Sequence, residues 1–561
     1  MSIPFHHLFN IPGTLFFLIF FPFSAFSEVS YQDTPMEIRA LLEGDESQVS
    51  MEFQAGRIYS RSYLLTFYSE RAFLPGWLEE SKPSCEALEL RLLIQQSKFD
   101  GLVPADYHLE QLNFLFERSL SDEILTEKEL AKMDILLSDA FMLLAKHLYQ
   151  GKVHPEHLEG IWDIQSKEDD PRLLEKLNLA LAKQNVRQQL FSLHPKFPIY
   201  QRMRQSLKKY YEMEQASTGL NWKNPVPEEP LEPGQAATQI PAIRDILIFW
   251  KDLENYAQGV GEIEVYDSLM MEGVKRFQLR NGLLPDGKLG KATIEALNQD
   301  PKALIDKAMV NMERLRWLPD TTLQEFVLVN IANYSMDYIR ERDTLLHSNA
   351  IVGQSYRKTP VFNAEMSYLV FSPTWTVPPT ILKNDVIPAV KKDIGYLAVK
   401  RMKILDFSGR EIDPKAINWS GISRNNFPYM VRQTPGRHNA LGLVKFMFPN
   451  KYNVYIHDTP SRELFFRADR ALSSGCIRIQ KPFELAQLLL SDQPLWNEER
   501  IRNAMESGKE QTVTLKKKIP VIILYLTFWS DGAFRENIRR DIYSRDGELL
   551  KLLQLPLIHE N

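Results

Sequence analysis

Cysteine is almost absent from this chain. Only two, Cys85 and Cys476, occur in 561 residues. Folds that depend on disulfides carry many more, so a disulfide framework is excluded, although the two thiols could still form a single bridge. Cys85 is spaced with Leu88 and Leu92 as on one face of a helix, which predicts a packed, structural position for this residue.

The chain also lacks an excess of basic charge. It has 67 Lys and Arg against 72 Asp and Glu, a formal net charge of −5, which argues against nucleic acid as a partner. It has no His, Cys and Asp cluster with the spacing of metal ligands, and no glycine-rich phosphate loop. We therefore expect neither a metal nor a cofactor.

Long hydrophobic runs are scarce as well. The one at the N-terminus, Leu15 to Phe21, is followed by Ala25-Phe26-Ser27, which has small residues at the two positions that a signal peptidase inspects. This predicts a signal peptide over residues 1–27 and export of the remainder. No Lys or Arg precedes the apolar run, so an uncleaved N-terminal anchor is the alternative. Prolines and a glycine interrupt the stretch, which makes it a poor membrane span.

Residues 28–222 are predicted to form a helical domain. Its clearest apolar stripe stays on one face for five turns, with Gly151 in position to end that helix: Leu130, Met133, Leu137, Phe141, Leu144 and Leu148. Four prolines between Asn224 and Gly234 then predict a stiff, exposed linker over residues 223–239.

Residues 240–300 have the pattern of a small three-helix module. Apolar stripes run from Ile243 to Leu253 and from Met270 to Phe277, and a short helix is expected over Lys291 to Leu297. Turn-rich sequence separates the last two helices.

The hydrophobic period changes toward two from about residue 320. Runs such as Phe326 to Ile331 and Pro520 to Thr527 predict strands, so residues 301–510 are expected to form a mostly β domain. Residues 511–561 would complete it with further strands and a helix. Mixed helical and loop sequence at about 380–430 interrupts the pattern, as an inserted flap would. The predicted fold class is a multi-domain protein of α and β parts.

Two short strings carry the candidate chemistry: YIHDTP (Tyr455 to Pro460) and SSGCIRI (Ser473 to Ile479). Strand alternation places Tyr455 and His457 on the face opposite Val454 and Ile456, which point toward the expected core. Cys476 follows a small-residue turn, and Arg478 lies on its side of the next strand.

These residue types suit acyl transfer. A histidine within reach can take the proton of a thiol, since the thiolate is the nucleophile, and return it to a leaving amine. Gly475 allows close backbone approach, so its N–H is a candidate oxyanion donor, and Arg478 offers a bidentate grip on a carboxylate. A spacing of nineteen residues between His457 and Cys476 is weak by itself, and a buried structural cysteine is the simpler reading of spacing alone.

The two strings together resemble the signature of the L,D-transpeptidases, the YkuD-type cysteine enzymes of bacterial cell walls. The resemblance implies that Cys476 is the acylated nucleophile, that His457 is its base, and that the backbone carbonyl of Asp458 orients the histidine. It implies that Arg478 binds substrate. Ser474 stands where many members have a second histidine, so His457 would act alone.

Other parts of the chain resemble the large multi-domain Gram-negative branch of that family. The matching strings are Val352 to Pro360, Ser372 to Pro378 and Asn439 to Phe446. The insertion at 380–430 is similar to its capping subdomain. The three-helix module is similar to a peptidoglycan-binding domain, and Asp100 to Tyr107 to the scaffold domain that precedes it. Ser474 is a candidate for substrate binding beside Arg478. Tyr455 and Trp375 are further candidates to line the cleft, with a position in the core of the β domain as the alternative for each aromatic.

The resemblance implies a periplasmic enzyme that attacks tetrapeptide stems of peptidoglycan and forms 3→3 cross-links through a cysteine acyl-enzyme. Peptidoglycan stem peptides are the expected partners, and a covalent carbapenem adduct is expected. Two alternatives remain open. One is a hydrolase with the same Cys and His, either an L,D-carboxypeptidase or an enzyme that releases wall-bound proteins. The other is a non-catalytic wall-binding scaffold.

Overall fold

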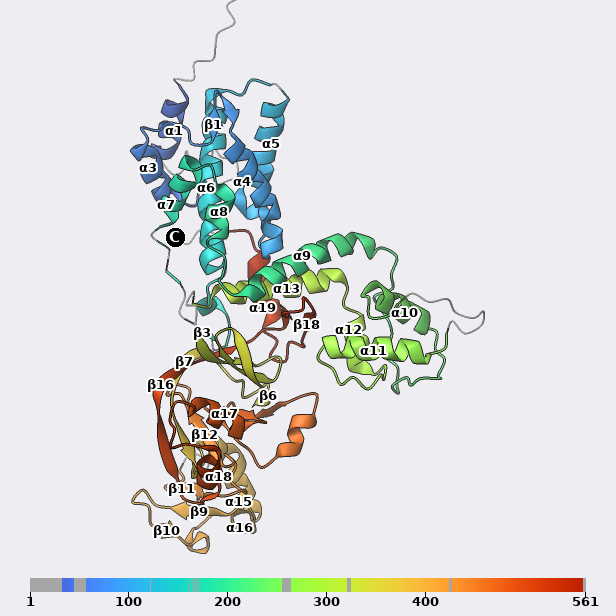
Figure 1. Ribbon diagram of the computed structural model, residues 1–561, viewed down its shortest axis with the longest axis vertical. Helices are drawn as coiled ribbons and strands as arrows, with labels where there is room; N and C mark the ends of the chain where they lie inside the picture. Colours follow the sequence, from blue (N-terminus) through green and yellow to red (C-terminus); the bar gives the residue numbers. More distant parts are fainter. Residues whose placement is uncertain are drawn as a thin grey trace, which may run out of the picture.

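A computed structural model describes most of the chain after residue 32: residues 33–44, 57–121, 123–160, 162–164, 167–168, 170, 172–254, 264–319, 324–422 and 426–557. The predicted signal peptide lies outside these residues. The described part is elongated, with the N-terminal helices at one end of the long axis and the insertion of the β domain at the other (Figure 1). No helix within it is long and apolar enough to span a membrane.

The N-terminal domain is helical, as predicted, and is built around α6, Glu127–Gln150. Thr126 and Glu129 form a capping box at its start, and Gly151, with φ of 94°, ends it. The predicted stripe from Leu130 to Leu148 is buried. The other helices of this domain are α1 (Thr34–Glu43), α3 (Arg61–Glu70), α4 (Cys85–Gln96), α5 (Leu109–Leu120), α7 (Leu173–Ala182) and α8 (Val186–Phe191), with a small hairpin of β1 (Leu78–Glu79) and β2 (Lys82–Pro83).

The prediction for Cys85 was wrong. Cys85 is an exposed, free cysteine at the start of α4, and Leu88 and Leu92 are exposed beside it. The helix is rotated so that a different set faces the core: Ala87, Leu90, Leu93 and Ile94. Both stripes have helical spacing, so packing against α6 and α8 decides which one is buried. Cys476 is also a free thiol, so the structure contains no bridge between the two cysteines.

The three-helix module is present where the sequence predicts it, as α10 (Ile240–Phe249), α11 (Ser268–Arg280) and α12 (Lys291–Leu297). Its core contains the two predicted apolar stripes. The proline-rich segment before it is mostly exposed but is attached to the module, because Leu231 bridges Leu289 and Ala236 bridges Val265.

Two long helices and the C-terminal helix join the three parts of the molecule. They are α9 (Pro198–Ala216), α13 (Pro301–Arg316) and α19 (Asp546–Gln554). Asp300 caps α13 and Pro301 occupies its first turn. The C-terminal end of α19 contacts the N-terminal domain, because Lys152 Nζ donates to the carbonyls of Leu553 and Leu555.

The β domain is built on a ten-stranded sheet with strand order β12-β13-β15-β6-β5-β4-β16-β7-β3 and β14 paired with β6. The sheet closes on itself, because β12 pairs with β7 as well as with β13. The bounds are β3 (Trp162–Asp163), β4 (Glu325–Asn330), β5 (Ser335–Arg340), β6 (Asp343–Gly353), β7 (Val361–Phe371), β12 (Val444–Met447), β13 (Ile456–His457), β14 (Ala471–Ser473), β15 (Ile477–Ile479) and β16 (Gln511–Leu524). Helices α17 (Pro482–Leu489) and α18 (Glu498–Glu506) follow β15.

Residues from both ends of the chain complete this sheet. Strand β16 lies between β4 and β7, so the segment after residue 510 belongs to the sheet, as predicted. Strand β3 comes from the N-terminal domain and pairs with β7 in parallel, which the sequence did not suggest. A separate hairpin follows β16, formed by β17 (Phe528–Ser530) and β18 (Glu536–Ile538).

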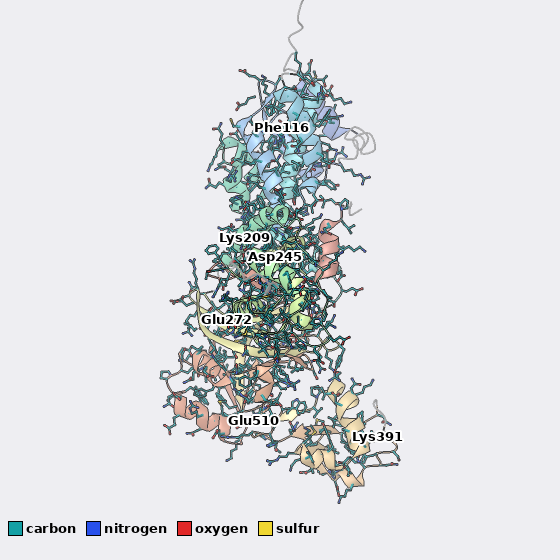
Figure 2. All side chains as sticks on the ribbon, turned by 90° about the vertical axis from the view of Figure 1, so that its right-hand side faces the viewer. Phe116, Lys209, Asp245, Glu272, Lys391 and Glu510 are labelled. Atoms are coloured by element: carbon teal, nitrogen blue, oxygen red, sulfur yellow. The ribbon has the colours of Figure 1, made fainter. Side chains whose placement is uncertain are left out.

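The insertion forms a small cap with its own core, centred on Val377, Leu397, Ile404 and Val431. The sequence predicted helices and loops here, but the cap also has a four-stranded sheet, β10-β9-β11-β8. Its elements are β8 (Trp375–Thr376), α14 (Pro379–Ile381), α15 (Ile387–Lys392), α16 (Gly395–Val399), β9 (Met402–Leu405), β10 (Glu411–Ile412) and β11 (Met430–Gln433). Figure 2 shows the cap, labelled at Lys391, standing to one side of the body, on which Glu510 lies. Glu510 accepts hydrogen bonds from Thr374 N–H and Oγ1 at the entry to the cap.

Candidate active site

Three neighbouring strands bring the candidate residues to one face of the sheet. Strand β13 runs parallel to β15, with His457 opposite Arg478, and antiparallel to β12, with Lys445 opposite His457. The alternate residues Val454, Ile456, Ile477 and Ile479 are buried in the core on the other face. The predicted alternation is therefore confirmed, although only Ile456 and His457 of the expected strand are paired as a strand.

Cys476 lies at the end of the turn before β15 and is partly exposed. Its Sγ lies 3.8 Å from the Asn453 carbonyl oxygen. The Tyr455 hydroxyl lies near Cys476 and near the Trp375 side chain, and burial followed by Cys476 raises its pKa. Tyr455 and Trp375, both predicted to line the cleft, thus meet at the thiol, and Trp375 comes from the first strand of the cap.

His457 is buried, and its Nδ1 lies 2.5 Å from the carbonyl oxygen of Asp458. A carbonyl only accepts, so Nδ1 carries the proton and Nε2 is left as a base. Burial, followed by the charge of Arg478, lowers the pKa of His457 to about 3. The imidazole is therefore neutral at physiological pH, in the state that can accept a proton.

The thiol is also neutral at rest. Burial raises the pKa of Cys476 above its ordinary value, and hydrogen bonds from Tyr455 and the charge of Arg478 only partly offset this. Among the hydrogen bonds of the described residues, none joins Cys476 to His457. The two groups share a face on neighbouring, parallel strands. Such pairs often tighten only when substrate binds.

The turn before Cys476 differs from the prediction in one respect. The N–H of Gly475 donates to Ser473 Oγ at 3.1 Å, so it does not point into the cleft. No hydrogen bond of the described residues uses the Cys476 N–H. The available oxyanion donor is therefore the N–H of Cys476 itself. Gly475 is needed for another reason: its φ of 118° is accessible to glycine and strained for other residues.

Arg478 is a cation without a counter-ion. It makes no salt bridge with any described residue, and its Nε is buried with no hydrogen-bond partner. Burial lowers its pKa, which the nearby Cys476 partly reverses. A buried Nε donor with no acceptor among the described residues can receive an anion, and a carboxylate fits the planar donor geometry of a guanidinium.

Ser474 contacts the cap through a residue that sequence reasoning missed. Arg357 Nη1 donates to Ser474 Oγ at 2.9 Å and to Asp385 Oδ2, in the cap, at 2.8 Å. The only signal for Arg357 in the sequence is its place in the string Val352 to Pro360. Ser474 therefore acts on the position of the cap as well as lying beside the nucleophile.

Two further residues that sequence reasoning missed hold the nucleophile turn from behind. Thr359 Oγ1 donates to the Gly475 carbonyl and accepts from the Gly353 N–H, both at 2.9 Å. Tyr543 Oη donates to the Gly353 carbonyl at 2.5 Å and accepts from the Thr359 N–H. The contacts of Thr359 with Gly475, and of Tyr543 with Gly353 and Thr359, join residues more than 100 positions apart, so no local pattern could have predicted them.

The side chain of Asp458 has a structural role distinct from that of its carbonyl. Its carboxylate accepts from the Leu443 N–H at 2.9 Å and from Arg462 at 3.0 Å. A Cβ on Gly442 would collide with this carboxylate, and Gly442 has φ of 62°. The string Asn439 to Phe446 thus fixes the strand end that carries His457. No group of three or more metal-ligating side chains occurs among the described residues.

Three family models match successive parts of the chain. Residues 62–207 match a scaffold domain, residues 245–297 match a domain described as "Putative peptidoglycan binding domain", and residues 324–523 match the L,D-transpeptidase catalytic domain. The site described above lies within the last of these ranges.

A protein of Haemophilus influenzae described as "Putative L,D-transpeptidase" is 38% identical over 246 residues, which cover 44% of this chain. The matched region spans 49%, about half, of that relative's length.

Two solved L,D-transpeptidase structures also match. One, from Xylanimonas cellulosilytica, has 13% identity, a TM-score of 0.18, and coverage of 54% of this chain and 100% of its own. The other, from Stackebrandtia nassauensis, has 11% identity, a TM-score of 0.20, and coverage of 54% and 97%. The assignment rests on the family models and the Haemophilus relative. The chain therefore carries an L,D-transpeptidase catalytic domain, preceded by a scaffold domain and a peptidoglycan-binding domain.

Proposed function

We propose that this protein is an exported, periplasmic L,D-transpeptidase that forms 3→3 cross-links in peptidoglycan through an acyl-enzyme on Cys476. The observation that carries the proposal is the set of groups on one sheet face: a partly exposed thiol, a neutral histidine with its Nδ1 proton held by Asp458, and the unpaired guanidinium of Arg478. Arg357 ties this face to the cap, because it donates to both Ser474 and Asp385.

In the first half-reaction, Arg478 holds a carboxylate of the donor tetrapeptide stem. His457 Nε2 takes the thiol proton as Cys476 Sγ attacks the carbonyl carbon between meso-diaminopimelate and D-Ala. The Cys476 N–H stabilises the oxyanion. The C–N bond then breaks, and the leaving D-Ala amine receives the proton from His457, which leaves a thioester on Cys476.

In the second half-reaction, the side-chain amine of another stem attacks the thioester. His457 accepts the proton of that amine, and the departing thiolate takes it back. Because thiol and imidazole are both neutral at rest, proton transfer and attack occur together, without a preformed thiolate–imidazolium pair. The cap would favour the amine by excluding water from the thioester.

A hydrolase with the same first half-reaction is the second candidate. Water would replace the amine, which gives an L,D-carboxypeptidase or an enzyme that releases wall-bound proteins. Product mass spectrometry separates the two, since a dimeric muropeptide requires the amine. A non-catalytic wall-binding scaffold would bind sacculi and form no covalent adduct.

The decisive experiment is intact-mass detection of an adduct after incubation with tetrapeptide stems or a carbapenem. The chain offers a matched control, because Cys85 is its other cysteine and is exposed and free. We expect Cys85→Ala to keep the adduct and Cys476→Ala to lose it while remaining folded. An adduct on Cys476→Ala, or none on the wild type, would refute the proposal. N-terminal sequencing of the exported protein tests signal cleavage.

A further inference from the structure

A large cavity lies between the peptidoglycan-binding module and the catalytic sheet, apart from the Cys476 site. Its volume is about 1240 Å³. One wall is the loop between α11 and α12, and the other is formed by β5, β6, the β17–β18 hairpin and residues 466–470. The module stands beside β18 and β6 in Figure 1, so this cavity is at the junction of two domains.

The cavity is lined by an excess of positive charge: seven Lys and Arg side chains against four Asp. Four of the seven make no salt bridge with any described residue: Arg467, Arg470, Arg539 and Arg540. A cluster of arginines without carboxylate partners is uncommon, because each charge normally requires a counter-ion or full hydration.

The two inner arginines hydrogen-bond to neutral groups. Arg539 donates to Asn333 Oδ1 at 2.6 Å and to the Arg280 carbonyl at 3.0 Å, which ties the module to the catalytic domain. Arg470 donates to the carbonyls of Ala350 and Tyr334. Burial, followed by the charge of Arg470, lowers the pKa of Arg539 to about 10. An anion between them would relieve this repulsion.

The four aspartates of the lining already have partners. Asp337 pairs with His347, and Asp531 pairs with Arg535. Asp469 accepts from Tyr334 Oη at 2.8 Å, and Asp286 accepts from Gln278 Nε2 at 3.0 Å. Asp469 lies close enough to Arg470 to raise its pKa in part, but the two form no salt bridge. Tyr334 and Gln278 are neutral, so Asp469 and Asp286 keep their charges, and the attraction for an anion rests on the excess of seven Lys and Arg over four Asp.

Apolar side chains lie beside these arginines. Phe466 is 78% exposed and Leu284 is 57% exposed, and both line the cavity. The volume exceeds the range of about 300–1,000 Å³ that small-molecule pockets span. A lining with both exposed apolar side chains and arginines fits an extended glycopeptide that carries carboxylates. Its sugar or peptide carbons would contact Phe466, and its carboxylates would contact the arginines.

We propose that this cavity is a second peptidoglycan site, which binds the free carboxylates of a stem peptide through Arg467, Arg470, Arg539 and Arg540. The inference rests on the proposed function in its choice of ligand. One wall of the cavity is the domain that matches the peptidoglycan-binding family, which favours a wall strand over other polyanions.

The cavity is also connected to the active site along the chain. Strand β14, Ala471–Ser473, joins Arg470 to the turn that carries Cys476. Cys476 is six positions after Arg470, which is at most about 20 Å of extended chain. A glycopeptide held in the cavity would therefore keep its own or a neighbouring stem within reach of the thiol.

The test measures binding of a soluble disaccharide tetrapeptide to the full chain by equilibrium dialysis. Cys476→Ala and Arg478→Gln are present in every protein, to stop turnover and weaken the active site. Arg467 and Arg540 are the exposed members of the cluster, so R467E/R540E changes the charge without removing the hydrogen bonds of the inner pair. R500Q/R502Q, on the exposed face of α18, is the control for loss of two arginines.

We expect R467E/R540E to bind the muropeptide at least tenfold more weakly, and R500Q/R502Q to bind it unchanged. The same muropeptide with its carboxylates amidated should bind the protein with all four arginines as weakly as the unmodified muropeptide binds R467E/R540E. Unchanged affinity of R467E/R540E, with its unfolding temperature also unchanged, would overturn the inference. So would equal binding of the amidated ligand.

A separate measurement distinguishes failure of the inference from failure of the proposed function. With Cys476 and Arg478 intact, R467E/R540E should form the Cys476 adduct with a free tetrapeptide, which lacks the disaccharide, at the wild-type rate. Loss of that adduct would place the two arginines in the active site and overturn the second site. Absence of the adduct in the wild type would refute the transpeptidase chemistry and leave the binding result to stand by itself.

Discussion

The hydroxyl of Thr359 links the nucleophile turn to the sheet, and its removal gives a quantitative prediction. The side chain is fully buried, and Oγ1 serves two backbone groups: the Gly353 N–H and the Gly475 carbonyl, both at 2.9 Å. Thr359→Val keeps the shape and removes the hydroxyl. Each buried partner left unsatisfied costs about 1–3 kcal/mol, so for the two partners we expect a loss of about 2–6 kcal/mol.

For a domain of about 200 residues, each kcal/mol lowers the unfolding temperature by about 2–4 °C, so we expect a fall of about 4–24 °C, measurable by calorimetry. The rate of Cys476 adduct formation should fall with it, because Gly475 is no longer held. Thr359→Ser is the matched control: it keeps both hydrogen bonds and loses one methyl. If the free energy of unfolding of Thr359→Val is within about 0.5 kcal/mol of the wild-type value while Thr359→Ser is destabilised, the hydroxyl is not the source of stability and the reasoning fails.

Three other predictions follow from the site. His457 is held neutral with a pKa of about 3, so the rate of adduct formation should not fall through a pKa near 6.5 as the pH is lowered. The free energy of unfolding should instead decrease as the pH falls from about 6.5 to 3, because the unfolded state takes up a proton on this histidine and the folded state does not. His457→Gln should lack this decrease. Gly442→Ala should lower the free energy of unfolding, measured in urea, by about 2–4 kcal/mol, because the positive φ and the Asp458 carboxylate both exclude a Cβ. Gly409→Ala is the control and should lower it less, because Gly409 also has a positive φ but open space around it. Arg357→Gln should change the free energy of unfolding by less than about 1 kcal/mol and should raise the rate of hydrogen exchange in the cap near Asp385. An unchanged exchange rate there would contradict the linking role of Arg357.

Much of the architecture was predictable because it depends on local periodicity. The stripe from Leu130 to Leu148 and the module helices are where their apolar spacing places them, since a helix with one apolar face has one way to bury it. Cys85 shows the limit of this reasoning. Helix α4 carries apolar residues on more than one face, and contacts with other helices determine which face is inside.

The candidate site was predictable to the same extent. Strand alternation places Tyr455 and His457 on one face, and parallel pairing of β13 with β15 sets them beside Cys476 and Arg478. The oxyanion donor was not predictable, because the sequence does not show that Ser473 Oγ uses the Gly475 N–H. The signal peptide and the site roles stay predictions.

By itself, the sequence determined the order of the domains, the helices and strands with clear periods, and the string of residues that can carry acyl transfer. These follow from side-chain spacing and chemistry within short segments. Only the tertiary structure decided that Thr359 and Tyr543 hold the nucleophile turn, that Arg357 joins it to the cap, and that a strand of the scaffold completes the catalytic sheet. It also decided that four arginines with no salt bridge to a described residue meet in one cavity. Each of these joins residues far apart in the chain, and their proximity depends on how the packed elements meet.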